Sequence, residues 1–92
     1  MPLHLLTSNL TESKMCRYSV EMTDTFAGEA NYCWVHRVEI DAPADATSQT
    51  LIRRAKRALN LAPCRHRTQD WGDLIRLDIQ NNPICIFITP TL

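Results

Sequence analysis

The sequence predicts an α+β domain in which an antiparallel sheet of four to five strands carries one amphipathic helix on one face, in the order β-β-α-β-β. Two early segments alternate between apolar and polar residues, as strands do. A helical stripe of apolar residues follows, and two more strand-like segments end the chain. With 92 residues, the chain has the length of one domain. We expect residues 15–92 to form this domain and residues 1–14, which are polar and weakly patterned, to be an N-terminal extension.

Two strands joined by a loop are predicted before the helix. In the segment 16–23, apolar side chains share one face of a half-buried strand: Cys16, Tyr18, Val20 and Met22. In the segment 32–40, a second set shares a face that we expect to be covered: Tyr32, Trp34, His36, Val38 and Ile40. On that face, His36 is predicted to be a partly buried structural histidine. Residues 24–31, which include Gly28, are predicted to form a hairpin loop.

The most regular pattern predicts a helix that is capped by Asp45, Thr47 or Ser48 and ends near Leu61. At about 100° per residue, apolar side chains form one stripe: Leu51, Ile52, Ala55, Ala58 and Leu59. Four cations are predicted on the opposite, exposed side: Arg53, Arg54, Lys56 and Arg57. Pro63 comes soon after the predicted end, where it cannot extend the helix.

The segments after the helix favour a second hairpin. Residues 64–70 fit either an extended basic segment or a short strand. Residues 74–79 alternate, and we expect Ile75, Leu77 and Ile79 to point inward. Residues 80–83 form a predicted turn, and residues 84–89 are apolar on both faces, which is typical of a well-covered strand.

Composition excludes several classes of protein. With two glycines, Gly28 and Gly72, the chain holds neither a P-loop nor a GxGxxG motif. No apolar run approaches the length of a membrane span, and the first residues lack the pattern of a secretory signal. We therefore expect an intracellular protein with reduced thiols and no membrane partner.

Charges are sorted along this chain, although its formal net charge is zero. Residues 21–45 hold six acids and one base, whereas residues 53–67 hold six bases and no acid. Such poles suit a protein that binds an anionic surface on one side and a basic one on the other.

The predicted basic face of the helix is the leading candidate for a binding site. Four cations on one helix face match the spacing of phosphates in a nucleic-acid backbone. Arg65 and Arg67 would continue the patch if their segment runs nearby. The alternative is a solvated face without a partner. Solvated faces usually mix both signs, whereas this one has no acid to form pairs along the helix. We expect it to contact nucleic acid or another anionic partner.

The predicted loop at 24–31 is a second candidate, with four side chains suited to contact a protein partner: Asp24, Phe26, Glu29 and Asn31. The alternative is a plain hairpin loop.

Metal binding and catalysis are weakly supported. Cys33 and His36 would point to opposite faces of a strand, Cys64 and His66 could share one, and no CxxC occurs. We expect buried structural thiols, no metal and no cofactor. Cys33 with His66 or His36 could be written as a thiol dyad, but nothing in the spacing demands it, and we expect no enzyme. Trp34 and Trp71 favour core or rim positions over base stacking.

A resemblance to a known group gives these features a context. The segment 22–37 is similar to a stretch found in short proteins of phages and other mobile elements. Together with the size and the helix at 50–58, it makes the chain resemble a type I-F anti-CRISPR protein over about residues 15–90.

The resemblance implies a function without catalysis. Such proteins act in the cytoplasm of the host cell, where they bind the crRNA-guided surveillance complex, called Cascade or the Csy complex. They contact its Cas proteins and guide RNA, and they block hybridisation of target DNA or recruitment of the nuclease. The alternative is a small nucleic-acid-binding regulatory protein of a mobile element that reads duplex DNA through the helix. Only Gln49 and Asn60, at the two ends, offer amides there for adenine.

Overall fold

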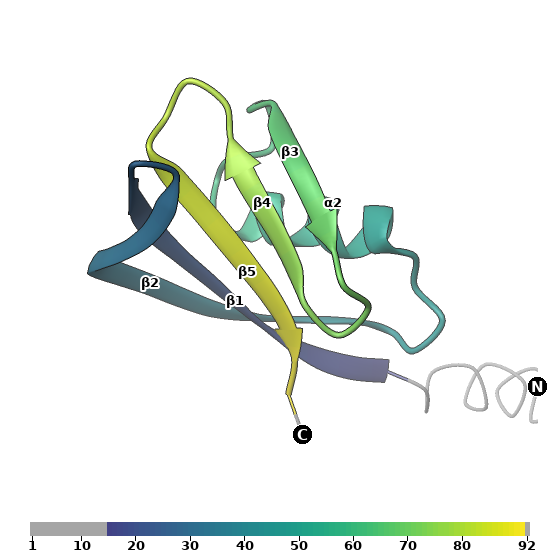
Figure 1. Ribbon diagram of the computed structural model, residues 1–92. Helices are drawn as coiled ribbons and strands as arrows, with labels where there is room; N and C mark the ends of the chain where they lie inside the picture. Colours follow the sequence, from purple (N-terminus) through teal and green to yellow (C-terminus); the bar gives the residue numbers. More distant parts are fainter. Residues whose placement is uncertain (1–14, 92) are drawn as a thin grey trace, which may run out of the picture.

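The computed structural model describes residues 15–91, so the predicted extension at 1–14 lies outside the described residues. The elements, in order, are β1 (Met15–Phe26), β2 (Glu29–Pro43), α2 (Ser48–Ala58), β3 (His66–Asp70), β4 (Ile75–Ile79) and β5 (Ile84–Pro90). The five strands form one antiparallel sheet in the order β2-β1-β5-β4-β3, with α2 on one face (Figure 1). The predicted α+β class, with an antiparallel sheet and one helix, is confirmed. The chain order is β-β-α-β-β-β, because the segment that the sequence leaves open forms the strand β3.

The core lies between α2 and the sheet face beneath it. Strand pairing places Val20 opposite Ile88 and Leu77 opposite Ile86, so these side chains share that face. The predicted inward side chains of β4 are all buried. α2 adds Leu51, Ile52 and Ala55, and its C-cap residue Leu59 is buried with them. Burying a Val, Leu or Ile side chain stabilises a domain by about 1.5–3 kcal/mol.

The helix α2 follows its predicted boundaries closely at the start and ends early. Thr47 is the N-cap, and its hydroxyl accepts from the backbone N–H of Thr50 at 3.3 Å. The chain leaves the helix after Ala58, and Asn60 adopts a left-handed φ of 61°, which Asn tolerates better than most residues. The predicted extension to Leu61 is therefore wrong. Ala58 is exposed, because it lies at the edge of the apolar stripe.

The β1–β2 hairpin is longer than predicted, and its turn is shorter. Ala27 and Gly28 form the turn, and both have positive φ, 55° and 83°. Two successive residues with positive φ are what a two-residue type I′ turn requires. Most of the predicted loop at 24–31 therefore belongs to the strands.

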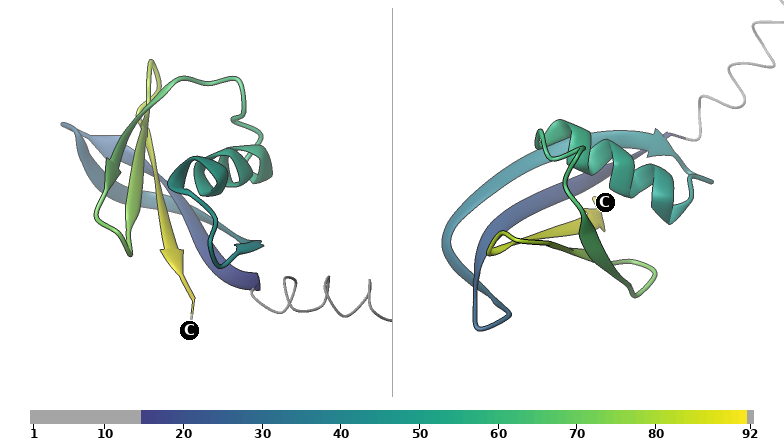
Figure 2. Two further views of the ribbon diagram at one scale, coloured as in Figure 1. Left: turned by 90° about the vertical axis from the view of Figure 1, so that its right-hand side faces the viewer. Right: turned by 90° about the horizontal axis from the view of Figure 1, so that it is seen from above.

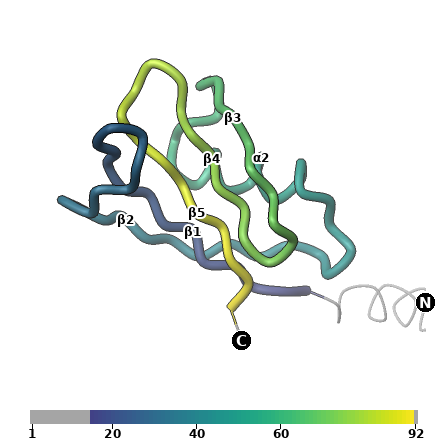
Figure 3. The backbone as a smooth tube through the Cα atoms, in the orientation of Figure 1, coloured from purple at the N-terminus to yellow at the C-terminus, as the bar shows by residue number. Residues whose placement is uncertain are grey.

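The end of this hairpin bends over the sheet face that α2 leaves open (Figures 2 and 3). The Arg76 guanidinium on β4 donates to the carbonyl of Gly28 at 2.8 Å, and the N–H of Thr25 donates to the carbonyl of Pro83 at 2.9 Å. The bend explains why Thr23 and Cys85 are buried, although both lie on the face opposite the helix.

The turn offers a test of this geometry. Ala27 adopts a left-handed conformation, which is unfavourable for Ala because of its Cβ. Asn tolerates this conformation better, and Asn-Gly is a preferred pair in type I′ turns. We expect Ala27→Asn to raise the free energy of unfolding by about 0.5–1 kcal/mol, measured by urea denaturation. Ala44→Asn is the control, because Ala44 is an exposed turn residue without a positive φ. An equal gain in both variants would contradict the strained turn.

Candidate functional site

The exposed side of α2 carries three arginines, Arg53, Arg54 and Arg57, which we call the arginine face. The helix holds no acidic residue. In the part of the chain that the structure describes, ion pairs involve Arg17, Arg37 and Arg76 and no member of the arginine face. Arg54 donates to the carbonyl of Asp41 at 2.6 Å, and this bond leaves its charge without a counter-ion. The face is thus a cluster of cations that an anionic partner can neutralise.

Lys56 does not belong to this face, and its predicted exposure is wrong. Its exposed fraction is 7%. The ammonium group donates to the carbonyl of Cys64 and lies 3.0 Å from Nδ1 of His66. Four residues along a helix amount to a rotation of about 40°, so Lys56 lies beside Ile52 at the margin of the buried stripe. The chain that returns from the helix then covers the lysine stem.

The predicted continuation of the basic patch through β3 is also wrong for Arg67. His66 and Thr68 face α2, because their partners Ile79 and Leu77 belong to the core. Since side chains alternate along a strand, Arg67 points to the opposite face of the sheet, where it pairs in register with Asp78. Arg65 is exposed just before β3, and its carbonyl accepts from the N–H of Gln80 at 2.9 Å.

At the other end of the molecule, Asp24 and Asn31 support the hairpin backbone. The Asn31 amide donates to Oδ2 of Asp24, and the N–H of Cys33 donates to Oδ1, both at 2.8 Å. The bond from Asn31, more than that from Cys33, keeps the pKa of Asp24 below its usual value. Phe26 and Glu29, the other predicted contacts, are exposed.

These bonds hold an irregular segment of β2, residues 31–34, which we call the β2 bulge. Thr23 pairs with Val35 and Thr25 with Ala30, so one residue of β1 lies opposite four residues of β2. Tyr32 in the bulge has a φ of 58°, which is unusual for an aromatic residue. The hydroxyl of Thr23 donates to the carbonyl of Trp34 at 2.7 Å and so ties the bulge to β1.

Near the bulge and the turn, four large apolar side chains are exposed, and the sequence predicts a contact role for Phe26 alone among them. These residues, which we call the tip patch, are Phe26 (74% exposed), Tyr32 (56%), Trp34 (42%) and Val35 (46%). The expectation that Tyr32, Trp34 and His36 lie on a covered face is wrong. An 11-residue helix spans about 16 Å, whereas a 15-residue strand spans about 50 Å, so α2 covers one end of β2.

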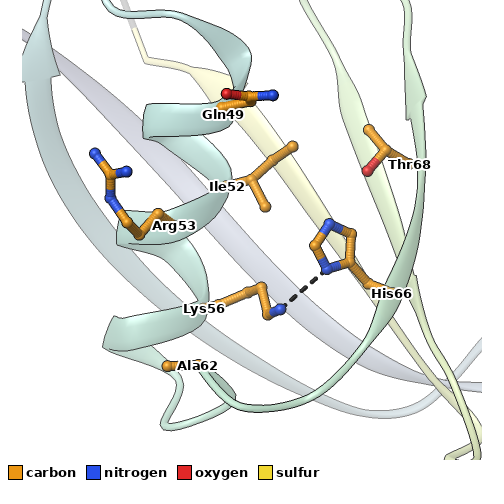
Figure 4. A pocket seen from close by; sticks show the side chains of 7 residues that line it. All are labelled: Gln49, Ile52, Arg53, Lys56, Ala62, His66 and Thr68. Carbon is orange, nitrogen blue, oxygen red and sulfur yellow. Dashed lines mark hydrogen bonds between the residues drawn. The ribbon is translucent and has the colours of Figure 1, made fainter.

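A cavity of about 390 Å³ opens between α2 and β3 (Figure 4). Its lining comes from α2, the following loop and β3: Gln49, Ile52, Arg53, Lys56, Ala62, His66 and Thr68. Burial, together with the neighbouring Lys56 charge, lowers the pKa of His66 below its ordinary value. Sequence reasoning misses this cavity, because it treats Lys56 as exposed and leaves the position of residues 64–70 open.

The lowered pKa of His66 makes a prediction for stability. The unfolded chain binds a proton more readily at this residue, so stability rises with pH near 6.5 and is lost as the pH falls. We expect urea midpoints of the wild type to fall between pH 7.5 and pH 5.5 by more than those of His66→Gln. Equal falls in both proteins would show that His66 does not contribute.

The cysteines are free, and their exposure differs. Cys85 is buried, which raises its pKa, whereas Cys33 is exposed and its predicted burial is wrong. The dyad of Cys33 with His66 does not form, because β2 and β3 are the two opposite edges of the sheet. Within residues 15–91, no three Cys, His, Asp or Glu side chains cluster in a way that could hold a metal ion. No helix in that range has the length and apolar character needed to cross a membrane.

Comparison with known proteins adds no relative: no family model, no curated protein and no solved structure matches the chain.

Proposed function

We propose that this chain is a non-catalytic binding protein that docks on the crRNA-guided surveillance complex of a type I-F CRISPR system in the host cytoplasm and blocks recognition of target DNA. The observation that carries the proposal is the arginine face, three exposed guanidinium groups on a helix without a carboxylate. The partner class comes from the resemblance of residues 22–37 and 50–58 to type I-F anti-CRISPR proteins.

The arginine face suits the phosphates of a guide RNA. A guanidinium group offers planar, paired N–H donors that match the oxygens of phosphate. Because Arg53, Arg54 and Arg57 lie within little more than one turn of α2, they can contact neighbouring phosphates together. Each contact releases counter-ions, so the affinity is expected to fall steeply with salt.

The tip patch suits a protein surface. Exposed aromatic side chains are frequent anchors in protein interfaces, and a patch held by backbone bonds loses little entropy on binding. Asp24 accepts from the N–H of Cys33, and Thr23 donates to the carbonyl of Trp34, so these bonds support the backbone that carries Tyr32 and Trp34. Glu29, exposed beside the turn, adds a carboxylate for a basic residue of a Cas protein.

Binding experiments with purified components test the proposal. We expect the chain to bind the DNA-free surveillance complex, to lose affinity when target DNA is already hybridised, and to bind bare guide RNA weakly. Binding to bare duplex DNA, without any effect on the complex, would overturn the proposal and support the alternative of a regulatory DNA-binding protein.

A further inference from the structure

Lys56 is a buried cation without an anionic partner. Its exposed fraction is 7%, and its ammonium group contacts a neutral carbonyl, that of Cys64, and the imidazole of His66. No ion pair joins it to a carboxylate in the described residues. A buried charge without a counter-ion is costly, so proteins pair such groups or use them to bind an ion.

The contact between Lys56 and His66 fixes the hydrogen-bond chemistry of the cavity. An ammonium group has no acceptor, so Nδ1 of His66 must accept at 3.0 Å, and the proton of the neutral ring lies on Nε2. Burial and the Lys56 charge lower the pKa of His66, which favours this neutral form. Figure 4 shows the second ring nitrogen turned into the cavity, toward Ile52 and Thr68.

The cavity walls therefore offer hydrogen-bond donors and no carboxylate. Lys56 carries positive charge on the helix side, whereas the Arg53 guanidinium group points away from Lys56 and His66. His66 and the hydroxyl of Thr68 lie on the strand side. Donors on two sides suit a tetrahedral group with several acceptor oxygens better than a planar carboxylate. Ile52 and Ala62 add apolar surface to the cavity. Inorganic phosphate would not contact this surface, whereas the organic part of a phosphorylated ligand could.

We propose that the cavity between α2 and β3 binds the phosphate group of a small phosphorylated ligand, with Lys56 and His66 as its principal donors. Its volume of about 390 Å³ lies within the range of small-molecule sites and exceeds the needs of free phosphate. This site goes beyond the proposed function, because its principal donors lie outside the arginine face, and a small ligand could occupy it with or without the surveillance complex.

Titration of the full isolated chain tests the site. The probes are 5′-AMP, inorganic phosphate and adenosine, followed by NMR at the His66 ring and the Thr68 amide. We expect saturable shifts with AMP, binding at least tenfold weaker with phosphate, and none with adenosine. Equal affinity for AMP and phosphate would identify free phosphate as the ligand. Absence of saturable shifts with both anions, or shifts with adenosine equal to those with AMP, would overturn the proposal.

Variants connect the binding to the proposed donors. Lys56→Met keeps a long apolar side chain in the buried position, and we expect it to weaken AMP binding at least tenfold. Thr68→Val, which preserves shape in an exposed strand residue, should weaken binding several-fold and serves if Lys56→Met fails to fold. Arg67→Gln removes one positive charge from the opposite side of the same strand, so its AMP affinity should stay unchanged. Equal AMP affinity in wild type, Lys56→Met and Thr68→Val would refute the assignment. These titrations contain no Cas protein, so a negative result would refute the phosphate site and would not affect the proposed docking on the surveillance complex.

Discussion

Replacement of Arg53, Arg54 and Arg57 together by Gln is expected to lower the affinity for the surveillance complex at least about 100-fold. Hydrogen bonds to charged groups are worth about 1.5–3 kcal/mol each, and a loss of three exceeds the roughly 2.7 kcal/mol of a 100-fold change. The slope of log affinity against log salt should decrease in magnitude by about 2, which corresponds to three contacts with single-stranded phosphates. Gln keeps good helix propensity, so α2 should persist.

A matched variant separates the arginine face from net charge. Arg17, Arg37 and Arg67, all replaced by Gln, remove the same three charges from other surfaces, and the first two already pair with carboxylates. We expect this control to bind with nearly wild-type affinity in titrations at two salt concentrations. Equal losses in both triple variants would mean that overall charge, rather than the arginine face, drives binding. If neither triple variant loses affinity for the surveillance complex, the arginine face is solvated and does not contact the partner.

The part of the fold that the sequence predicts is the part where periodicity and burial coincide. Ile75, Leu77 and Ile79 alternate because β4 lies between β5 and β3 and these three side chains are buried in the core, so the pattern records their environment directly. The same reasoning fails on β2, where Tyr32 and Trp34 also alternate. Alternation shows which residues share a face, but whether that face is covered depends on the length and position of α2.

The candidate site shows a similar limit. Helical geometry places Lys56 beside Ile52, whereas its charge favours an exposed position. Lys56 is buried because residues 59–66 return over its side chain, and the sequence does not show that path. The β2 bulge contains neither Gly nor Pro, the residues that often mark a bulge in a sequence. Asp24 and Asn31 are the sequence features that could have indicated the bulge. Short polar side chains of this kind often form hydrogen bonds with nearby backbone groups, which interrupts a regular strand.

Thr23→Val is expected to destabilise the protein by about 1–3 kcal/mol, although it replaces a buried residue by one of the same shape. Thr23 has an exposed fraction of 0%, and its hydroxyl donates to the carbonyl of Trp34 at 2.7 Å. Valine fills the same space but leaves that carbonyl without its donor at the base of the β2 bulge. Urea denaturation of both proteins measures the difference.

The comparison with Thr23→Ser shows whether the bond or the packing matters. Serine keeps the hydroxyl and loses one methyl group, so we expect it to retain the bulge at a cost in stability of about 1 kcal/mol. In Thr23→Val, amide exchange at residues 31–34 should accelerate more than exchange in β4, because the lost bond is local. Affinity for the surveillance complex should fall with it, since Trp34 in the tip patch depends on the bulge for its position. If Thr23→Val equals the wild type in stability and exchange, the bulge is held by Asp24 and Asn31 without Thr23.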